Sequence, residues 1–141
     1  MSPRKEQRTE GCGPGEAAIR LSQAKKFLEV ATLVESEAAL LPSSASLTAA
    51  LAVLAGIAAS DAACCSALRR RSRSAYHKDA GTLLRLITHG GPAAAKQFER
   101  LIALKDSAHY GVIHPNQDAL TGAMRDAAGL VTFAEAVLRR Q

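Results

Sequence analysis

The sequence is poor in aromatic residues, with no Trp, two Tyr and three Phe among 141 residues. Aromatic and β-branched side chains are enriched in strands, whereas the alanine and leucine that dominate this chain favour helices whose backbones approach closely. A chain of this length can bury one hydrophobic core. The composition therefore predicts a single all-α domain.

Cysteine is also scarce, and its three positions, Cys12, Cys64 and Cys65, match no metal-binding spacing. Adjacent cysteines rarely pair with each other, and an odd number argues against the disulfide framework of a secreted protein. We therefore expect a reducing cytoplasm, with Cys64 and Cys65 as small core residues. The charged start of the chain does not resemble a signal peptide. No cofactor or metal is expected.

Only the run from Leu47 to Leu68 is long and apolar enough to raise the question of a membrane span. It consists mostly of alanine, and it contains Ser60, Asp61 and Ser66. Because an aspartate in the middle of a lipid-facing helix is costly, we expect a buried central helix and no membrane.

Apolar residues at spacings of three and four predict an up-and-down bundle of about five helices joined by short loops. Residues 1–15, which end in a glycine-rich segment, are expected to form a disordered arm, and residues 16–141 the bundle. The predicted helices cover residues 16–41, 44–70, 78–89, 92–110 and a last segment capped by Asn116 or Asp118. In the second helix the predicted inward stripe is Leu47, Leu51, Leu54, Ala58, Cys65 and Leu68.

Three ionisable residues continue these apolar stripes. Asp61 lies on the stripe of the second helix, and Lys105 and His109 lie on the stripe of the fourth. Because unpaired buried charges are costly, we expect Asp61 to face Lys105 or His109. The cluster is then either a structural clasp between two helices, or a cleft in which His109 acts as general acid or base and Lys105 stabilises negative charge.

A formal charge of +5 is compatible with an anionic partner. The best candidates for phosphate contact are Arg69, Arg70, Arg71 and Arg73, with Tyr76 as a stacking group. The alternative interpretation of this arginine cluster is a solvated helix end, where cations suit the helix dipole.

Three segments resemble HEPN (higher eukaryotes and prokaryotes nucleotide-binding) domains of small actinobacterial type. They are residues 55–61, Ala-Gly-Ile-Ala-Ala-Ser-Asp, then 70–77, Arg-Arg-Ser-Arg-Ser-Ala-Tyr-His, and 104–110, Leu-Lys-Asp-Ser-Ala-His-Tyr. The resemblance extends over about residues 17 to 140. It implies a helical bundle, a homodimer, and binding of RNA or a nucleotide.

Catalytic members of this family are metal-independent ribonucleases with an arginine, four to six residues, and a histidine. On this resemblance His109 matches the motif histidine and Asp106 the polar residue that follows the arginine. Lys105 stands one position closer to the histidine than the family's arginine, so the motif is not intact.

Two functions are therefore expected from the sequence. The first is a HEPN-like protein that binds RNA or a nucleotide, as a component of a toxin–antitoxin or stress-response system with a cognate partner protein. The second is a non-catalytic, dimeric protein-interaction module whose polar clasp is structural. A small-ligand site in the bundle core is a third.

Overall fold

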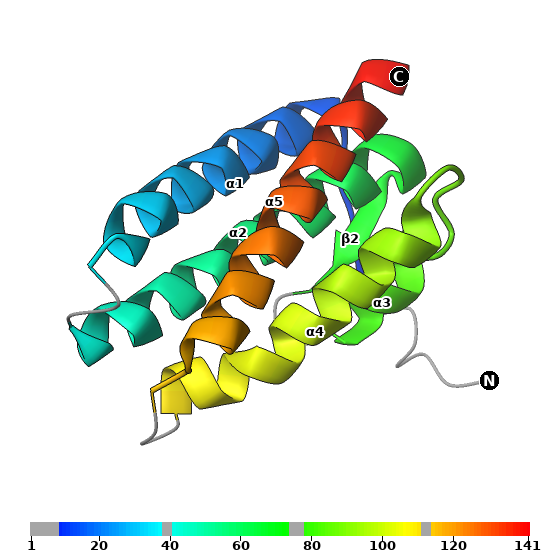
Figure 1. Ribbon diagram of the computed structural model, residues 1–141. Helices are drawn as coiled ribbons and strands as arrows, with labels where there is room; N and C mark the ends of the chain where they lie inside the picture. Colours follow the sequence, from blue (N-terminus) through cyan, green and yellow to red (C-terminus); the bar gives the residue numbers. More distant parts are fainter. Residues whose placement is uncertain (1–8, 38–40, 74–77, 111–113) are drawn as a thin grey trace.

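The computed structural model describes residues 9–37, 41–73, 78–110 and 114–141, with residues 78 and 106–110 described in their backbone alone. Five helices make up most of the described chain, so the predicted all-α bundle is confirmed (Figure 1). In chain order the elements are β1 (Thr9–Gly11), α1 (Pro14–Glu35), α2 (Pro42–Leu68), β2 (Arg70–Ser72), α3 (Lys78–Leu84), α4 (Gly91–Tyr110) and α5 (Gln117–Arg140).

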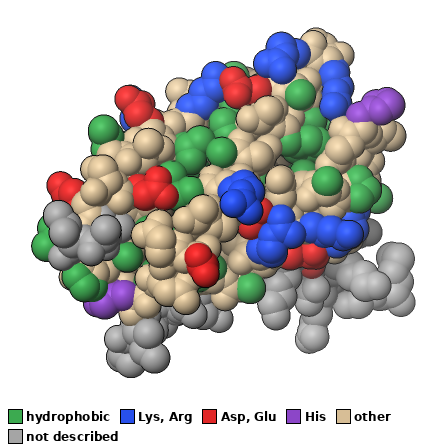
Figure 2. Space-filling view, in the orientation of Figure 1, with side chains coloured by type: hydrophobic (Ala, Val, Ile, Leu, Met, Phe, Trp, Pro, Cys, Tyr) green, Lys and Arg blue, Asp and Glu red, His purple; other side chains and the backbone are tan. Residues whose placement is uncertain are grey.

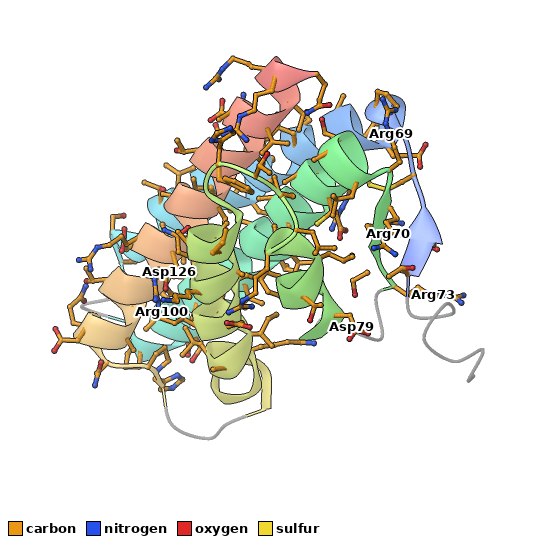
Figure 3. The ribbon with its side chains drawn as sticks, turned by 90° about the vertical axis from the view of Figure 1, so that its right-hand side faces the viewer. Arg69, Arg70, Arg73, Asp79, Arg100 and Asp126 are labelled. Atoms are coloured by element: carbon orange, nitrogen blue, oxygen red, sulfur yellow. A yellow bond between two sulfur atoms is a disulfide. The ribbon has the colours of Figure 1, made fainter. Side chains whose placement is uncertain are left out.

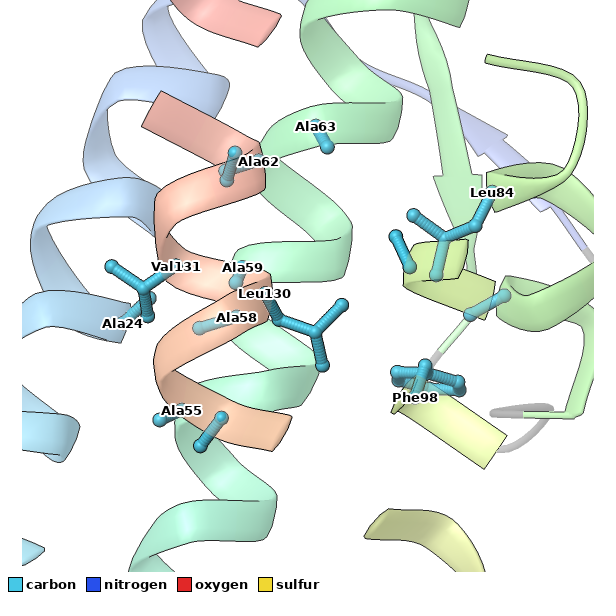
Figure 4. Packing of buried hydrophobic residues seen from close by; sticks show 14 of the residues in the cluster. Ala24, Ala55, Ala58, Ala59, Ala62, Ala63, Leu84, Phe98, Leu130 and Val131 are labelled. Atoms are coloured by element: carbon cyan, nitrogen blue, oxygen red, sulfur yellow. The ribbon is translucent and has the colours of Figure 1, made fainter. Parts of the chain in front are cut away.

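Helix α2 lies at the centre of the bundle and packs against α1, α4 and α5 (Figure 1). Gly56 marks its closest contact, because a Cβ atom built there would lie 2.5 Å from Leu101 Cδ1 of α4 and 3.3 Å from Leu130 Cδ1 of α5. Figure 4 shows the alanines of α2 beside Ala24 of α1 and Val131 of α5. Small side chains thus let three helices approach one central helix.

Two large apolar residues of α2 that were predicted to face inward are exposed. Leu47 is 50% exposed and Leu54 is 37% exposed, so the predicted inward stripe is wrong over the first half of the helix. The buried positions are mainly occupied by small residues, among them Ala45, Ala49, Ala52, Ala55, Gly56, Ala59, Ala62 and Ala63. Close helix contacts select for small side chains, and Leu47 and Leu54 are left outside.

All five predicted helices are present, and several of them begin or end at other residues. Helix α1 ends at Glu35 instead of residue 41, and α2 begins at Pro42 rather than after Ser43 or Ser44. Helix α3 ends at Leu84, five residues early, and the chain then turns through His89 and Gly90, which both have positive φ. The predicted cap of α5 is confirmed, because the Asn116 side chain accepts a hydrogen bond from the Ala119 N–H at 2.8 Å.

Two short strands are the main feature that the sequence did not predict. Strand β1 pairs antiparallel with β2, and Cys12, which follows β1, forms a disulfide with Cys65 of α2. Residues 9–15, expected in a disordered arm, therefore form β1 and the start of α1. Cys64 is a buried free thiol, as expected, but the prediction that Cys65 is a simple core residue is wrong.

In the described part of the chain, α2 is the one helix long and apolar enough to cross a membrane. Of the most apolar 18-residue stretch of α2, 72% is buried inside the bundle. Core helices of soluble proteins can be equally long and apolar, and they are mostly buried in the same way.

We expect Gly56→Val to lower the free energy of unfolding by about 1–3 kcal/mol, because the added methyl groups overpack the contact with Leu101 and Leu130. The matched control is Gly122→Ala on α5, where a Cβ atom meets no other atom within 4 Å. This control should stabilise by about 0.5–1 kcal/mol through helix propensity. Urea unfolding measures both, and equal effects of the two changes would contradict the packing argument.

Candidate nucleic-acid interface

The predicted arginine cluster begins where α2 ends. Arg69 adopts a left-handed backbone conformation, with φ 61° and ψ 24°, and it turns the chain out of the helix. The next three residues form β2, in which Arg70 is opposite Gly11 and Arg71 is opposite Glu10. The cluster is therefore a turn and a strand that follow the end of α2, and only Arg69 lies at the helix end itself.

Three of the four predicted arginines, Arg69, Arg70 and Arg73, are exposed, and we call them the arginine edge. Figure 3 shows them following one another along one side of the molecule, next to the β1–β2 pair. Neither Arg69 nor Arg70 forms an ion pair within the described part of the chain. Arg69 and Arg70 therefore present positive charge to solvent.

Arg71 has a structural role instead. Its Nη1 donates to Asp61 Oδ2 at 3.1 Å, and its Nη2 lies 2.9 Å from Glu10 Oε1 of β1. The same Asp61 oxygen accepts a hydrogen bond from Arg20 Nε of α1 at 3.0 Å. Asp61 thus connects α1, α2 and the strand pair through two arginines.

Asp61 itself is almost buried, at 8% exposure. Burial raises the pKa of this carboxyl group above its ordinary value, and the charges and hydrogen bonds of Arg20 and Arg71 oppose that rise. The desolvation of the carboxylate thus outweighs the attraction of its two partners. An ion pair of this kind specifies which segments meet, and contributes less to net stability than its geometry suggests.

The predicted pairing of Asp61 with Lys105 is wrong. Helix α4 runs antiparallel to α2, because Leu101 contacts Gly56 while Leu104 packs against Ala45 and Ala49 near the start of α2. Lys105 therefore lies toward the start of α2 and Asp61 toward its end. Counted from the contact of Leu101 with Gly56, Lys105 is level with about residue 52 of α2, roughly nine residues before Asp61. At 1.5 Å per residue this separation is roughly 13 Å along the helix axis.

Three other predicted site residues lie partly or wholly outside the described structure. Asp106 and His109 belong to α4 by their backbone, and their side chains are outside the described residues. Tyr76 is outside the described residues altogether. The proposed catalytic roles of Lys105, Asp106 and His109, and the stacking role of Tyr76, stay predictions.

Two other surface arginines are matched with carboxylates. Arg100 of α4 donates to both oxygens of Asp126 of α5, at 3.0 and 2.7 Å, and Arg85 donates to both oxygens of Glu99, at 2.7 and 2.9 Å. Figure 2 shows Lys and Arg side chains beside Asp and Glu side chains over the α3–α4 part of this face. The Arg100–Asp126 pair joins α4 and α5, and the Arg85–Glu99 pair joins the turn after α3 to α4. The positive charges in both pairs are neutralised.

Sequence reasoning missed Arg20 and Glu10 as partners in the ion network. Arg20 could have been found, because it lies at helical spacing from Ala17 and Ala24 on the buried stripe of α1. A charged residue that continues an apolar stripe is the signal that singled out Asp61. Glu10 carried no such signal, since its position depends on the pairing of two three-residue strands.

Two hollows lie among the described residues. One, of about 340 Å³, lies on the surface of α4 beside Phe98, Glu99, Ile102 and Ala103. A smaller one, of about 180 Å³, lies where α2 and α5 end, beside Leu68, Ile87 and Arg140. Within the described ranges, no three His, Cys, Asp or Glu side chains are grouped as metal ligands.

Comparison with protein-family models, with curated proteins and with solved structures finds no match for this chain. The geometry of the arginine edge and of its supporting ion network is therefore the basis for a functional proposal.

Replacing Asp61 with Asn should change the pH dependence of stability in a defined direction. Because the folded pKa of Asp61 lies above the unfolded value near 3.8, its contribution is fully present below pH 3.8 and is lost as the pH rises through the folded pKa. The free energy of unfolding of the wild type, minus that of Asp61→Asn, should therefore fall with rising pH. Urea unfolding between about pH 3 and 7 measures this difference.

Glu99→Gln is the matched control for this experiment. The hydrogen bonds and charge of Arg85 lower the pKa of Glu99, so the corresponding difference should rise with pH through the region below 4.5. If the free energy of unfolding of the wild type minus that of Asp61→Asn also rises with pH, the arginine partners of Asp61 outweigh the effect of its burial.

Proposed function

We propose that this chain is a HEPN-like domain that binds RNA or a nucleotide through the arginine edge. The observation that carries the proposal is the presence of exposed arginines on a backbone that strand pairing holds in place. Arginine binds phosphate through two parallel hydrogen bonds, and it suits this role better than lysine.

The fixed backbone matters for affinity. Ordering a flexible segment upon binding costs about 1–2 kcal/mol for each residue's backbone, and that cost is subtracted from the contact energy. Residues 70–72 are already paired with β1, and Arg69 accepts a hydrogen bond on its carbonyl oxygen from the Cys12 N–H at 3.1 Å. Phosphate contacts by Arg69 and Arg70 therefore need little further ordering of the backbone.

The charge around the edge supports an anionic partner. The chain carries a formal charge of +5, while the arginine–carboxylate pairs of α3, α4 and α5 neutralise charge elsewhere. Arg69 and Arg70 therefore remain as exposed positive charges beside the strand pair.

In this proposal the protein is a cytoplasmic component of a toxin–antitoxin or stress-response system, and it acts by binding. The incomplete motif at Lys105, Asp106 and His109 supports binding rather than cleavage, because lysine does not reproduce the bidentate phosphate contact of arginine. A homodimer and a cognate partner protein belong to the same proposal.

The salt dependence of RNA binding tests the arginine edge. We expect Arg69→Gln with Arg70→Gln to reduce the slope of log affinity against log salt by about 1.4 for single-stranded RNA, at roughly 0.7 for each phosphate that the variant no longer neutralises. Fluorescence anisotropy with a labelled oligouridylate measures the slope. The control, Arg125→Gln with Arg139→Gln, removes the same charge from exposed positions on α5, and its slope should match the wild type.

Incubation with total RNA tests the incomplete motif. We expect neither the wild type nor His109→Ala to cleave RNA, because the arginine that stabilises the phosphorane is missing at the matching position. Gel electrophoresis of the RNA over time is the measurement. Cleavage by the wild type that is lost in His109→Ala would instead establish a ribonuclease in which Lys105 replaces arginine.

A second candidate function, the dimeric protein-interaction module, is favoured by the exposed leucines of α2. Leu47 and Leu54 are seven residues apart, so they lie on one stripe of the helix and both face outward. Exposed apolar side chains that share a helix face are suited to packing against another helix. The partner in this function is a second copy of the chain.

Sedimentation equilibrium tests the second candidate. A dimer formed through the α2 leucines should dissociate at least tenfold more readily in Leu47→Glu, because association would bury the new charge. The control is Leu86→Glu, which changes a leucine that is 55% exposed and follows α3, outside the α2 stripe. Equal association of the two variants would contradict a dimer contact at Leu47.

A further inference from the structure

The Cys12–Cys65 disulfide joins the strand pair to the central helix. Its two cysteines are 53 positions apart, and Cys65 lies one helical turn after Asp61 on α2. One bond therefore fixes the start of the described chain beside the ion network that holds Arg71.

Strand β1 supports the arginine edge through three separate contacts. It pairs with β2 along residues 70–72, the Cys12 N–H donates to the Arg69 carbonyl oxygen, and Glu10 forms an ion pair with Arg71. In return, β1 is held by β2 and by the disulfide. A two-stranded pair of three residues each is too short to be stable alone in water.

The helical bundle does not depend on β1 in the same way. Helix α1 begins after β1 with its own cap, in which the Gly13 N–H donates to Glu16 Oε2 at 3.3 Å. Asp61 keeps its hydrogen bond from Arg20 whether or not β1 is in place, because Arg20 belongs to α1. Release of β1 would therefore loosen the edge and leave the helices packed.

We propose that the Cys12–Cys65 bond is a redox latch: its reduction releases β1, loosens the arginine edge and weakens RNA binding. The effect on RNA rests on the function proposed above, whereas the loosening of the edge does not.

The co-reactant is a dithiol reductant, and Cys12 is the accessible end of the bond. Cys12 is half-buried and Cys65 is fully buried, so the reductant's thiolate attacks Cys12 Sγ. The S–S bond breaks, and its electron pair passes to Cys65 Sγ, which takes up a proton. The second thiol of the reductant then displaces Cys12 as a thiol, so that the reductant becomes a disulfide and the protein gains two electrons and two protons.

The neighbouring Cys64 does not compete in this exchange. Burial raises the pKa of its thiol to about 12, with a further contribution from the charge of Asp61. A thiol that stays protonated is a poor nucleophile toward a disulfide. The latch is thus restricted to Cys12 and Cys65.

Hydrogen exchange by mass spectrometry, combined with anisotropy of a labelled oligouridylate, tests the latch on oxidised and dithiothreitol-reduced protein. On reduction, amide exchange should increase in residues 69–72, with α4 and α5 unchanged, and affinity should fall about tenfold. Cys12→Ser should behave like the reduced protein under both conditions. Cys64→Ala keeps the disulfide and should respond to reduction as the wild type does.

The outcomes separate the latch from the function. Unchanged exchange in residues 69–72 would overturn the latch whatever RNA does, and so would a rise in exchange throughout the helices. Faster exchange in residues 69–72 with equal RNA affinity of both forms would overturn control of binding. If that exchange rises and neither form binds RNA, the latch is supported and the proposed RNA function fails.

Discussion

The close packing of α2 against three other helices is the constraint on which the rest of the structure depends. A helix that is surrounded in this way can carry only small side chains where its neighbours touch it, and alanine and Gly56 occupy those positions. Larger side chains of the neighbouring helices, such as Phe98, Leu101 and Leu130, fill the core around α2. Leu47 and Leu54 of α2 itself are left exposed.

The same burial accounts for the ion network. A carboxylate on a helix this deeply enclosed is costly unless it is paired, and Asp61 is paired twice, with Arg20 and with Arg71. Because the two arginines come from α1 and β2, the pairing determines where both segments lie against α2. The position of the arginine edge therefore follows from a charge buried in the core.

The β1–β2 pair holds Arg69 and Arg70 at the surface of the protein. Arg71 turns toward Asp61, while Arg69 and Arg70 are left to solvent on a backbone fixed by Cys12 and by the strand contacts. An anion-binding role and a redox latch thus draw on the same few contacts. The apolar stripe of α2 is a separate surface, and it supports a protein contact independently of the arginine edge.

By itself the sequence determined the elements that arise from local patterns. Helical spacing predicted five helices and a buried central one, Asn116 predicted the start of α5, and an aspartate on an apolar stripe indicated that Asp61 must be paired. Each of these follows from residues within a few turns of one another. Such local patterns do not predict the direction in which one helix packs against another.

Tertiary structure alone decided the rest. The partners of Asp61 depend on the antiparallel course of α4, which carries Lys105 away, and on the return of the chain after Leu68, which brings Arg71 back. Strands of three residues leave no periodicity to detect, and β1 and β2 are about sixty residues apart in the chain. The pairing of Cys12 with Cys65 follows from that contact, because a disulfide requires two backbones to come within a few ångströms, and only the fold sets that distance.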